Sequence, residues 1–410
     1  MNWWTSLLLA ASVAAVWAGD IDSASLLARV QSRVRDNARR IPRYVCRQKI
    51  ERQSFAPLVR KPLQACVEES EQGLTKRPGL ALVVADRAQL DVMLTEGKEL
   101  FSWPGGHSFD TDTPADLLGG GFSGSGDFAS FVINVFTLDQ VTFEYLGACE
   151  GASCARYRYD VPLEVSHYIV ENTVRQATVG YHGTFDVDSR SADLIGMTVL
   201  PTDLSKALAA ACDIRIRMTY TRTAMQAGEF TIPETTEKEY LAKDGSFFVN
   251  RVSYEGCRQY TSESVLTFGN DAPATLPTSR AKISLALPVA GSELRLRLAS
   301  KIDSQVGSAG DSLEATLERA VRDTEGGTIP AGTVIRGHLA QLERVHFPQR
   351  HVVIAIRFDT IVLNGALVPL TLEPIGRMDR RGRASFSFGG ERLVLGKEFV
   401  SQWRVRSQAP

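Results

Sequence analysis

The stretch Leu90–Trp103, with the sequence LDVMLTEGKELFSW, decides the fold. Apolar and polar residues alternate on both sides of its central Glu-Gly pair, and the glycine supplies the positive φ that a two-residue hairpin turn requires. This turn sets a register in which Leu94 lies opposite Glu99 and Val92 lies opposite Phe101. The stretch is therefore predicted to be a β-hairpin of an antiparallel sheet.

One face of this hairpin is apolar, and it provides the candidate ligand-binding residues. Such a face can line a hydrophobic ligand site, or it can form ordinary core beneath a helix, which is the commoner role of an apolar strand face. Both interpretations stay open at this point. The residues concerned are Leu90, Val92, Leu94, Phe101 and Trp103.

The segments around the hairpin extend this pattern into a mainly β protein. Upstream, the spacing of Leu26, Val30 and Val34 predicts an amphipathic helix over residues 23–40. Downstream, short strand-like stretches separated by turn residues continue to about residue 260. We expect a curved antiparallel half-barrel sheet with an N-terminal helix.

A second domain follows a break in the pattern. Residues 261–282 lose periodicity and are rich in Gly, Pro, Ser and Asn, which predicts a linker between a domain at 19–260 and another at 283–410. Residues 284–410 contain 15 arginines, two lysines, 13 acidic residues and no cysteine. One Pro-Val-Ala-Gly turn and one Pro-Ala-Gly turn each precede a strand-like stretch there, which predicts a small β-barrel or sandwich.

The N-terminus has the pattern of a signal peptide. Residues 1–18 read MNWWTSLLLAASVAAVWA, without a charge, and Val16 and Ala18 are the small residues that a cut after Ala18 requires. A membrane anchor is the alternative, but a span requires about 20 apolar residues. We therefore expect a periplasmic or secreted protein with no transmembrane span after cleavage.

The cysteines agree with export to an oxidising compartment. Their number is even, and six thiols permit 15 pairings. If partners are close in sequence, the simplest set is Cys46–Cys66, Cys149–Cys154 and Cys212–Cys257. Metal binding is the competing interpretation, but one Cys-x4-Cys pair without a second pair or a nearby histidine does not match a zinc site.

Other chemistry is not indicated. The glycine-rich segment Gly119–Gly126 lacks the Lys-Ser/Thr of a phosphate-binding loop and does not place a serine at the centre of Gly-x-Ser-x-Gly. The six histidines show no His-Glu-x-x-His spacing and are interpreted as surface residues. We expect no catalytic residue, no metal and no cofactor.

The composition excludes two further classes of protein. The 410 residues are 44% hydrophobic and 23% charged, with a formal net charge of −1. This composition fits neither an acidic disordered chain nor a globally basic nucleic-acid binder.

The first domain resembles the outer-membrane lipoprotein carrier (LolA-like) family. The resemblance rests on the order of helix and strand, on the hairpin Leu90–Trp103, on Phe185–Asp188 with the strand Leu194–Val199, and on Phe230–Pro233. It implies a half-open curved sheet that holds acyl chains. The six cysteines and the appended domain depart from the family's plan.

The second domain resembles exported β-barrel modules of TrbI-type conjugation proteins. The resemblance rests on the phrase Ile329–Gly337, IPAGTVIRG. It implies a module that assembles and binds rather than catalyses.

The function that we expect from the sequence is non-enzymatic. It is an exported cell-envelope protein that binds a hydrophobic, lipid-like ligand or a lipoprotein. The alternative is a structural or protein-docking component of the envelope without a small ligand. The expected partners are lipid or an envelope protein and not nucleic acid, and the oligomeric state is left open.

Overall fold

The structure is a computed structural model, and it describes most of the chain. Described are residues 22–407 except 60–78, 96–97, 107, 110, 120–125, 127–129, 152, 173, 261–285 and 380–382. The predicted signal peptide, the predicted linker, the hairpin turn at Glu96-Gly97 and most of the glycine-rich segment therefore lie outside the described residues. No helix within the described ranges is long and apolar enough to cross a membrane.

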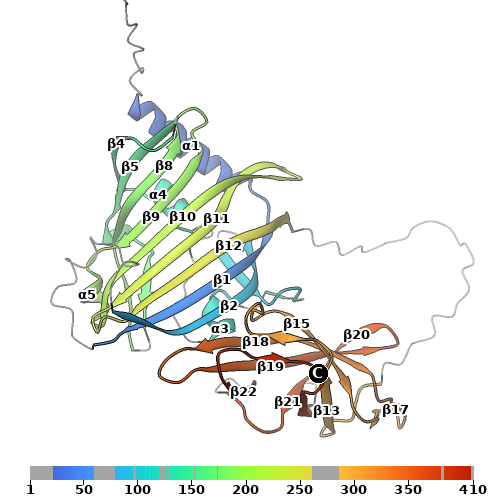
Figure 1. Ribbon diagram of the computed structural model, residues 1–410. Coiled ribbons are helices and arrows are strands. Elements are labelled where there is room, and N and C mark those ends of the chain that lie inside the picture. The colour runs from blue at the N-terminus through green and yellow to red at the C-terminus, as the bar shows by residue number, and fades with distance from the viewer. Residues whose placement is uncertain are drawn as a thin grey trace, which may run out of the picture.

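A curved sheet of ten antiparallel strands forms the first domain (Figure 1). Each strand pairs with the next in the order β4-β5-β8-β9-β10-β11-β12-β1-β2-β3, and the sheet is not closed into a barrel. The first strand of the chain thus lies beside the last strand of the domain. The bounds are β1 Tyr44–Pro57, β2 Leu80–Thr95, β3 Lys98–Ser102, β4 Thr142–Ala148, β5 Cys154–Val161, β8 Tyr181–Asp188, β9 Leu194–Pro201, β10 Ala211–Met225, β11 Gly228–Ala242 and β12 Phe247–Gln259.

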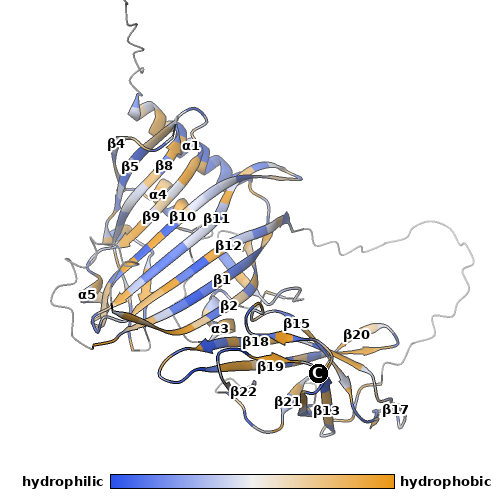
Figure 2. Cartoon of the chain, viewed as in Figure 1, coloured by the Kyte–Doolittle hydropathy of each residue, from blue (hydrophilic) through white to orange (hydrophobic). Residues whose placement is uncertain are grey.

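The hairpin register predicted from the sequence is confirmed. Leu94 pairs with Glu99 and Val92 pairs with Phe101 across β2 and β3. Along the strands of the sheet, apolar and polar residues alternate (Figure 2), as expected for strands with one buried face. The predicted fold class, a mainly β protein with a curved antiparallel sheet and an N-terminal helix, is confirmed.

Helices cover part of the buried face of this sheet. Helix α1 spans Ser23–Arg40, within the predicted range, and it buries Leu26, Val30 and Val34. Its cap is Asp22, whose side chain accepts a hydrogen bond from the Ser25 backbone. Helix α4 packs beside it in the same hydrophobic cluster. The remaining short elements are α3 Pro114–Leu118, α4 Ser130–Thr137, α5 Leu204–Ala207, a 3-10 turn Leu163–Val165 and the hairpin β6 Ile169–Glu171 with β7 Gln176–Thr178.

The second domain is a smaller β structure with its own core. Its strands pair in the order β24-β13-β15-β18-β19, and the consecutive strands β20 and β21 pair with β19 and β24 respectively. These strands surround one hydrophobic cluster, which includes the buried Trp403. The bounds are β13 Glu293–Leu298, β14 Ile302–Asp303, β15 Ser312–Leu317, β16 Val321–Arg322, β17 Thr328–Ile329, β18 Val334–Val345, β19 His351–Leu363, β20 Ala366–Pro369, β21 Leu372–Pro374, β22 Ala384–Gly389, β23 Val394–Leu395 and β24 Val400–Val405.

Strand pairing joins the two domains. Strand β3 pairs only with the last part of β2. Nearer the start of β2, strand β18 of the second domain pairs with the same edge, with Ala85 opposite Arg344. The Gln89 amide donates to the Ala309 carbonyl, and the Ala309 amide donates to the Arg87 carbonyl. The second domain therefore covers a strand edge that would otherwise be open to other chains.

Candidate functional site

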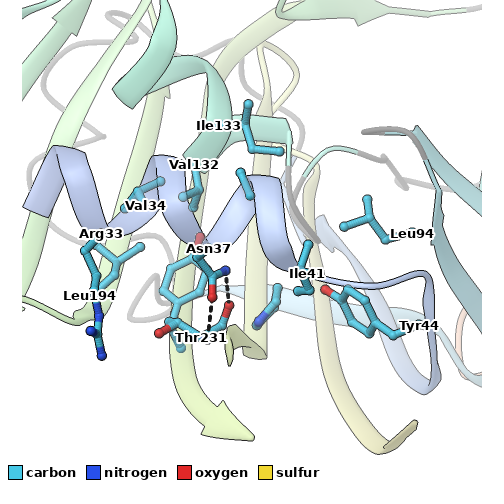
Figure 3. A pocket seen from close by; sticks show the side chains of 13 residues that line it. Arg33, Val34, Asn37, Ile41, Tyr44, Leu94, Val132, Ile133, Leu194 and Thr231 are labelled. Atoms are coloured by element: carbon cyan, nitrogen blue, oxygen red, sulfur yellow. Dashed lines mark hydrogen bonds between the residues drawn. The ribbon is translucent and has the colours of Figure 1, made fainter. Parts of the chain in front are cut away.

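An apolar cavity lies between helix α1 and the curved sheet (Figure 3). Its volume is about 60 Å³. Helices α1 and α4 form one side, and strands from both halves of the sheet form the other. The lining residues are Arg33, Val34, Asn37, Ala38, Ile41, Tyr44, Leu94, Val132, Ile133, Leu194, Tyr220, Thr231 and Pro233.

Polar side chains of this cavity fix the helix to the sheet. The Asn37 amide donates to the Thr231 carbonyl at 2.9 Å and accepts from the Thr231 backbone at 3.0 Å, as Figure 3 shows. The Arg33 guanidinium donates to the Asp193 carboxylate at 2.9 Å. These groups are engaged with protein, so the other lining residues, which are mostly apolar, determine what the cavity can hold.

Tyr44 also lines the cavity and is fully buried. Burial, and then the nearby Glu99 carboxylate, raise the pKa of its hydroxyl, so that Tyr44 stays neutral. Glu99 is itself buried and accepts a hydrogen bond from the Gly126 backbone at 2.9 Å. The hairpin predicted from the sequence thus holds the end of the glycine-rich segment.

The predicted ligand-binding residues lie in the hydrophobic core of this region. Leu90 and Val92 have no exposed surface, and Phe101 is equally buried. They pack in one cluster with residues of β1, β11 and β12. Of the five, only Leu94 lines the cavity beneath α1, while Trp103 lines a second cavity at the junction of the domains. The structure therefore distributes them between core and two cavities instead of grouping them in one site.

The disulfides differ from the sequence-neighbour set. Cys46 is bonded to Cys257, so the predicted pairs Cys46–Cys66 and Cys212–Cys257 are wrong. The reason is topological, because β1 lies beside β12 and brings the first cysteine to the last. Cys212 is also disulfide-bonded, and Cys66 lies outside the described residues.

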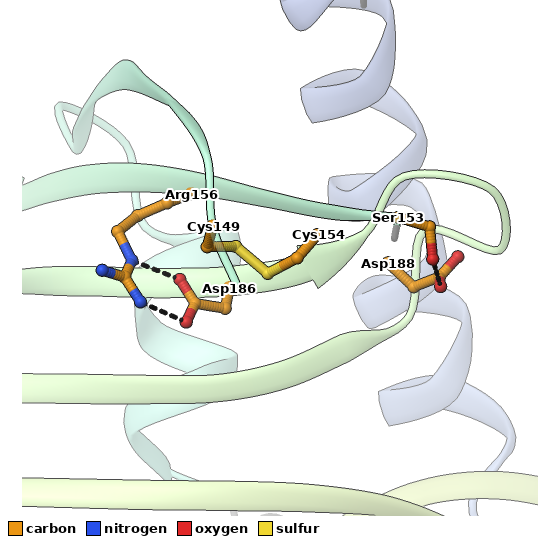
Figure 4. The surroundings of a disulfide bond; sticks show 6 residues. All are labelled: Cys149, Ser153, Cys154, Arg156, Asp186 and Asp188. Atoms are coloured by element: carbon orange, nitrogen blue, oxygen red, sulfur yellow. Dashed lines mark hydrogen bonds and ion pairs between the residues drawn. A yellow bond between two sulfur atoms is a disulfide. The ribbon is translucent and has the colours of Figure 1, made fainter. Parts of the chain in front are cut away.

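The predicted pair Cys149–Cys154 is confirmed (Figure 4). Asp186 lies close enough to both sulfurs to suggest a metal site. The sulfurs are bonded to each other, however, and metal binding requires thiolates. Asp186 instead forms a bidentate ion pair with Arg156, with both distances 2.7 Å. The disulfide and the neighbouring ion pair therefore have a structural role.

Two further cavities were missed by the sequence reasoning. One, of about 360 Å³, lies between the domains and is lined by residues from α3, β18, β19 and the segment after β3. The other, of about 290 Å³, lies in the second domain. Arg357 and Arg383 line both. No local pattern identifies either cavity, because the walls of the first come together only when the domains dock, and the second is formed by segments of the second domain that are distant in sequence.

No known protein family and no curated protein matches this chain. Among solved structures, the chain is similar to a DUF1329 family protein from Desulfovibrio piger, with a TM-score of 0.27 and 11% sequence identity. That similarity covers 60% of this chain and 97% of the other. The superposition is too loose to bear on fold or function.

Proposed function

We propose that the first domain is an exported, non-enzymatic binding module that holds a hydrophobic, acyl-type ligand between helix α1 and the curved sheet. The observation that carries this proposal is the apolar cavity there, whose Arg33 and Asn37 side chains are already bonded to protein. A ligand without polar groups can fill such a site by removing its apolar surface from water, at about 25 cal/mol per Å². The disulfides support a location in an oxidising compartment.

The cavity is too small for a complete acyl chain, so a longer acyl chain would require the cavity to enlarge. A volume of about 60 Å³ accommodates only part of an acyl chain. Helices α1 and α4 bound the cavity on one side and take no part in the hydrogen bonding between strands. Displacement of these helices would enlarge the cavity without breaking the strand ladder. The proposal therefore assigns α1 and α4 the role of a cover. The resemblance of the first domain to the LolA-like family implies a sheet that holds acyl chains, and a cover of helices is in keeping with it.

The proposal is tested by the lipid content of the purified protein. Residues 19–410 are produced in an oxidising compartment, and organic extracts are examined by mass spectrometry. We expect stoichiometric acyl material. The variant Val132→Trp places a larger side chain in the cavity and is expected to lose that material while keeping the β-sheet circular dichroism signal.

A matched control separates a filled cavity from a damaged fold. Ile195 lies on β9, is 42% exposed and does not line the cavity, unlike its buried neighbour Leu194. Ile195→Trp is expected to retain the lipid of the parent protein. If neither the parent protein nor the control contains lipid even after lipid is offered, the acyl-binding proposal is wrong, and the docking alternative takes its place.

A further inference from the structure

Helix α1 has an exposed face that acyl binding does not use. Its apolar face, with Leu26, Val30 and Val34, is buried on the sheet. Five of its 18 residues are arginines and one is an aspartate, so the helix carries a formal charge of +4. All five arginines are exposed, namely Arg29, Arg33, Arg35, Arg39 and Arg40.

The charge of α1 is opposite to that of the rest of its domain. Residues 41–260 contain 22 basic and 29 acidic residues, which gives a formal charge of −7. The whole chain has a formal net charge of −1. The positive charge of α1 is therefore concentrated on one part of the surface and does not reflect a generally basic protein.

One of the five arginines has a carboxylate partner among the described residues. The Arg33 guanidinium donates to the Asp193 carboxylate at 2.9 Å, so the charge of Arg33 is compensated. Arg29 and Arg35 each donate to a backbone carbonyl group, which holds the side chain without neutralising it. Neither of these two forms an ion pair in the ranges that the structure covers.

Arg39 and Arg40 lie in the last turn of α1, and no ion pair or side-chain hydrogen bond engages them within the described part of the chain. At 3.6 residues per turn, these two fall with Arg29 and Arg35 within an arc of about 140° on the side away from the buried residues. Asp36 is the one acidic residue of the helix and is exposed on the same arc. Four arginines against one aspartate leave this face with a charge of +3. We call it the basic face of α1.

The basic face lies over the cavity of the proposed acyl site. Val34, Asn37 and Ala38 line that cavity from the same turns of α1 that carry Arg35 and Arg39 (Figure 3). An α-helix with its side chains is about 10 Å across, so a surface bound to the basic face lies about that distance from the cavity.

We propose that the basic face of α1 docks the protein on a lipid bilayer with an anionic surface. The planar guanidinium group suits lipid phosphates, because it can donate to two phosphate oxygens at once. Each basic residue close to an anionic bilayer strengthens binding about fivefold, so several in one patch are required. The apolar face of α1 is engaged by the sheet, so the attachment is electrostatic and does not require insertion of the helix. Docking does not depend on acyl binding, whereas transfer of an acyl chain between the bilayer and the cavity rests on the proposed function.

The test is cosedimentation of residues 19–410 with vesicles. We expect binding to an equal mixture of phosphatidylcholine and phosphatidylglycerol, and none to phosphatidylcholine alone. Raising the salt concentration from about 0.01 M to about 0.15 M is expected to weaken binding, because the screening length falls from about 30 Å to about 8 Å. The double variant Arg39→Gln, Arg40→Gln is expected to bind at least about tenfold more weakly. Asp36→Asn removes the negative charge of the basic face and is expected to bind more tightly.

The double variant Arg319→Gln, Arg322→Gln is the matched control. It removes the same charge from two exposed arginines of the second domain that also form no ion pair with any described residue. It is expected to bind vesicles as the parent protein does. Val132→Trp, which fills the acyl cavity, is likewise expected to bind them, so a failure of acyl binding is distinguishable from a failure of docking.

Three results would overturn the proposal. The first is equal binding to vesicles with and without phosphatidylglycerol, and the second is equal binding by the two double variants. The third is binding of polyglutamate without binding of the anionic vesicles, which would assign the basic face to an acidic protein instead of a bilayer.

Discussion

Arg52 and Asp86 form a bidentate ion pair between neighbouring strands β1 and β2. The two distances are 2.8 and 2.7 Å, and only 11% and 10% of the side chains are exposed. Asp86→Ala leaves a nearly buried guanidinium without its carboxylate partner, so we expect a loss of about 3–5 kcal/mol in the free energy of unfolding. Urea unfolding measures it.

The control for this prediction is an exposed pair. Arg158 and Glu144 are 60% and 63% exposed, so Glu144→Ala is expected to cost less than about 1 kcal/mol. The double variant Arg52→Met, Asp86→Leu is expected to recover most of the stability lost in Asp86→Ala. Equal effects of the two single variants would contradict the assigned role of burial.

His338 makes stability depend on pH. Its pKa is lowered to about 3 in the folded protein, mainly by burial, against 6.5 for an unperturbed histidine. The unfolded chain therefore takes up a proton between these values that the folded chain does not. Stability is fully present above pH 6.5 and falls with decreasing pH, by about 3 kcal/mol down to about pH 4. His338→Leu is expected to reduce this dependence in urea unfolding.

The burial of His338 could not be predicted from the residues around it in the sequence. From the sequence, His338 was interpreted as a surface residue, and that prediction is wrong because only 12% of its side chain is exposed. Trp103, from the other domain, covers it. Local sequence contains no signal for a contact between residues so far apart.

At the scale of elements, the disulfide between β1 and β12 closes the longer loop of the two disulfides whose partners are both described. Cys46 and Cys257 are separated by 211 positions, whereas Cys149 and Cys154 are separated by five. Loop-closure entropy predicts a larger stabilisation from the longer loop. We expect the variant with both Cys46 and Cys257 changed to Ala to lose about 2–5 kcal/mol, and the corresponding Cys149, Cys154 variant about 2 kcal/mol or less, in urea unfolding. The reverse order would contradict this account.

Elements were the scale at which the sequence was most informative. Alternation and a turn glycine predicted the Leu90–Trp103 hairpin and its register, and helical spacing predicted α1. The disulfide pairing failed because it depends on which strands become neighbours. The order of strands in a sheet is set by long-range packing, which periodicity does not encode.

At the scale of the whole molecule, Gly310 allows the domains to dock. Its φ is +94°, and a Cβ at this position would lie 2.4 Å from the Gln89 carbonyl of β2. Gly310→Ala is therefore expected to separate the domains and to increase hydrogen exchange at the amides of β2 that pair with the second domain. Mass-spectrometric hydrogen exchange measures this change.

Gly332→Ala is the matched control for docking. Gly332 has φ of +86°, so an alanine there meets similar backbone strain, but nothing lies within 4 Å of the added Cβ. Exchange on β2 is expected to stay at the level of the parent protein. If both variants leave exchange on β2 unchanged, the strand pairing between the domains does not depend on this close approach.

The most direct test of acyl binding under α1 is photocrosslinking with a diazirine-bearing fatty acid, followed by mass-spectrometric location of the label. The account predicts label on peptides of α1 and α4, removed by excess unlabelled fatty acid and absent in Val132→Trp. Label confined to other segments, or equal label in Val132→Trp and the parent protein, would contradict it.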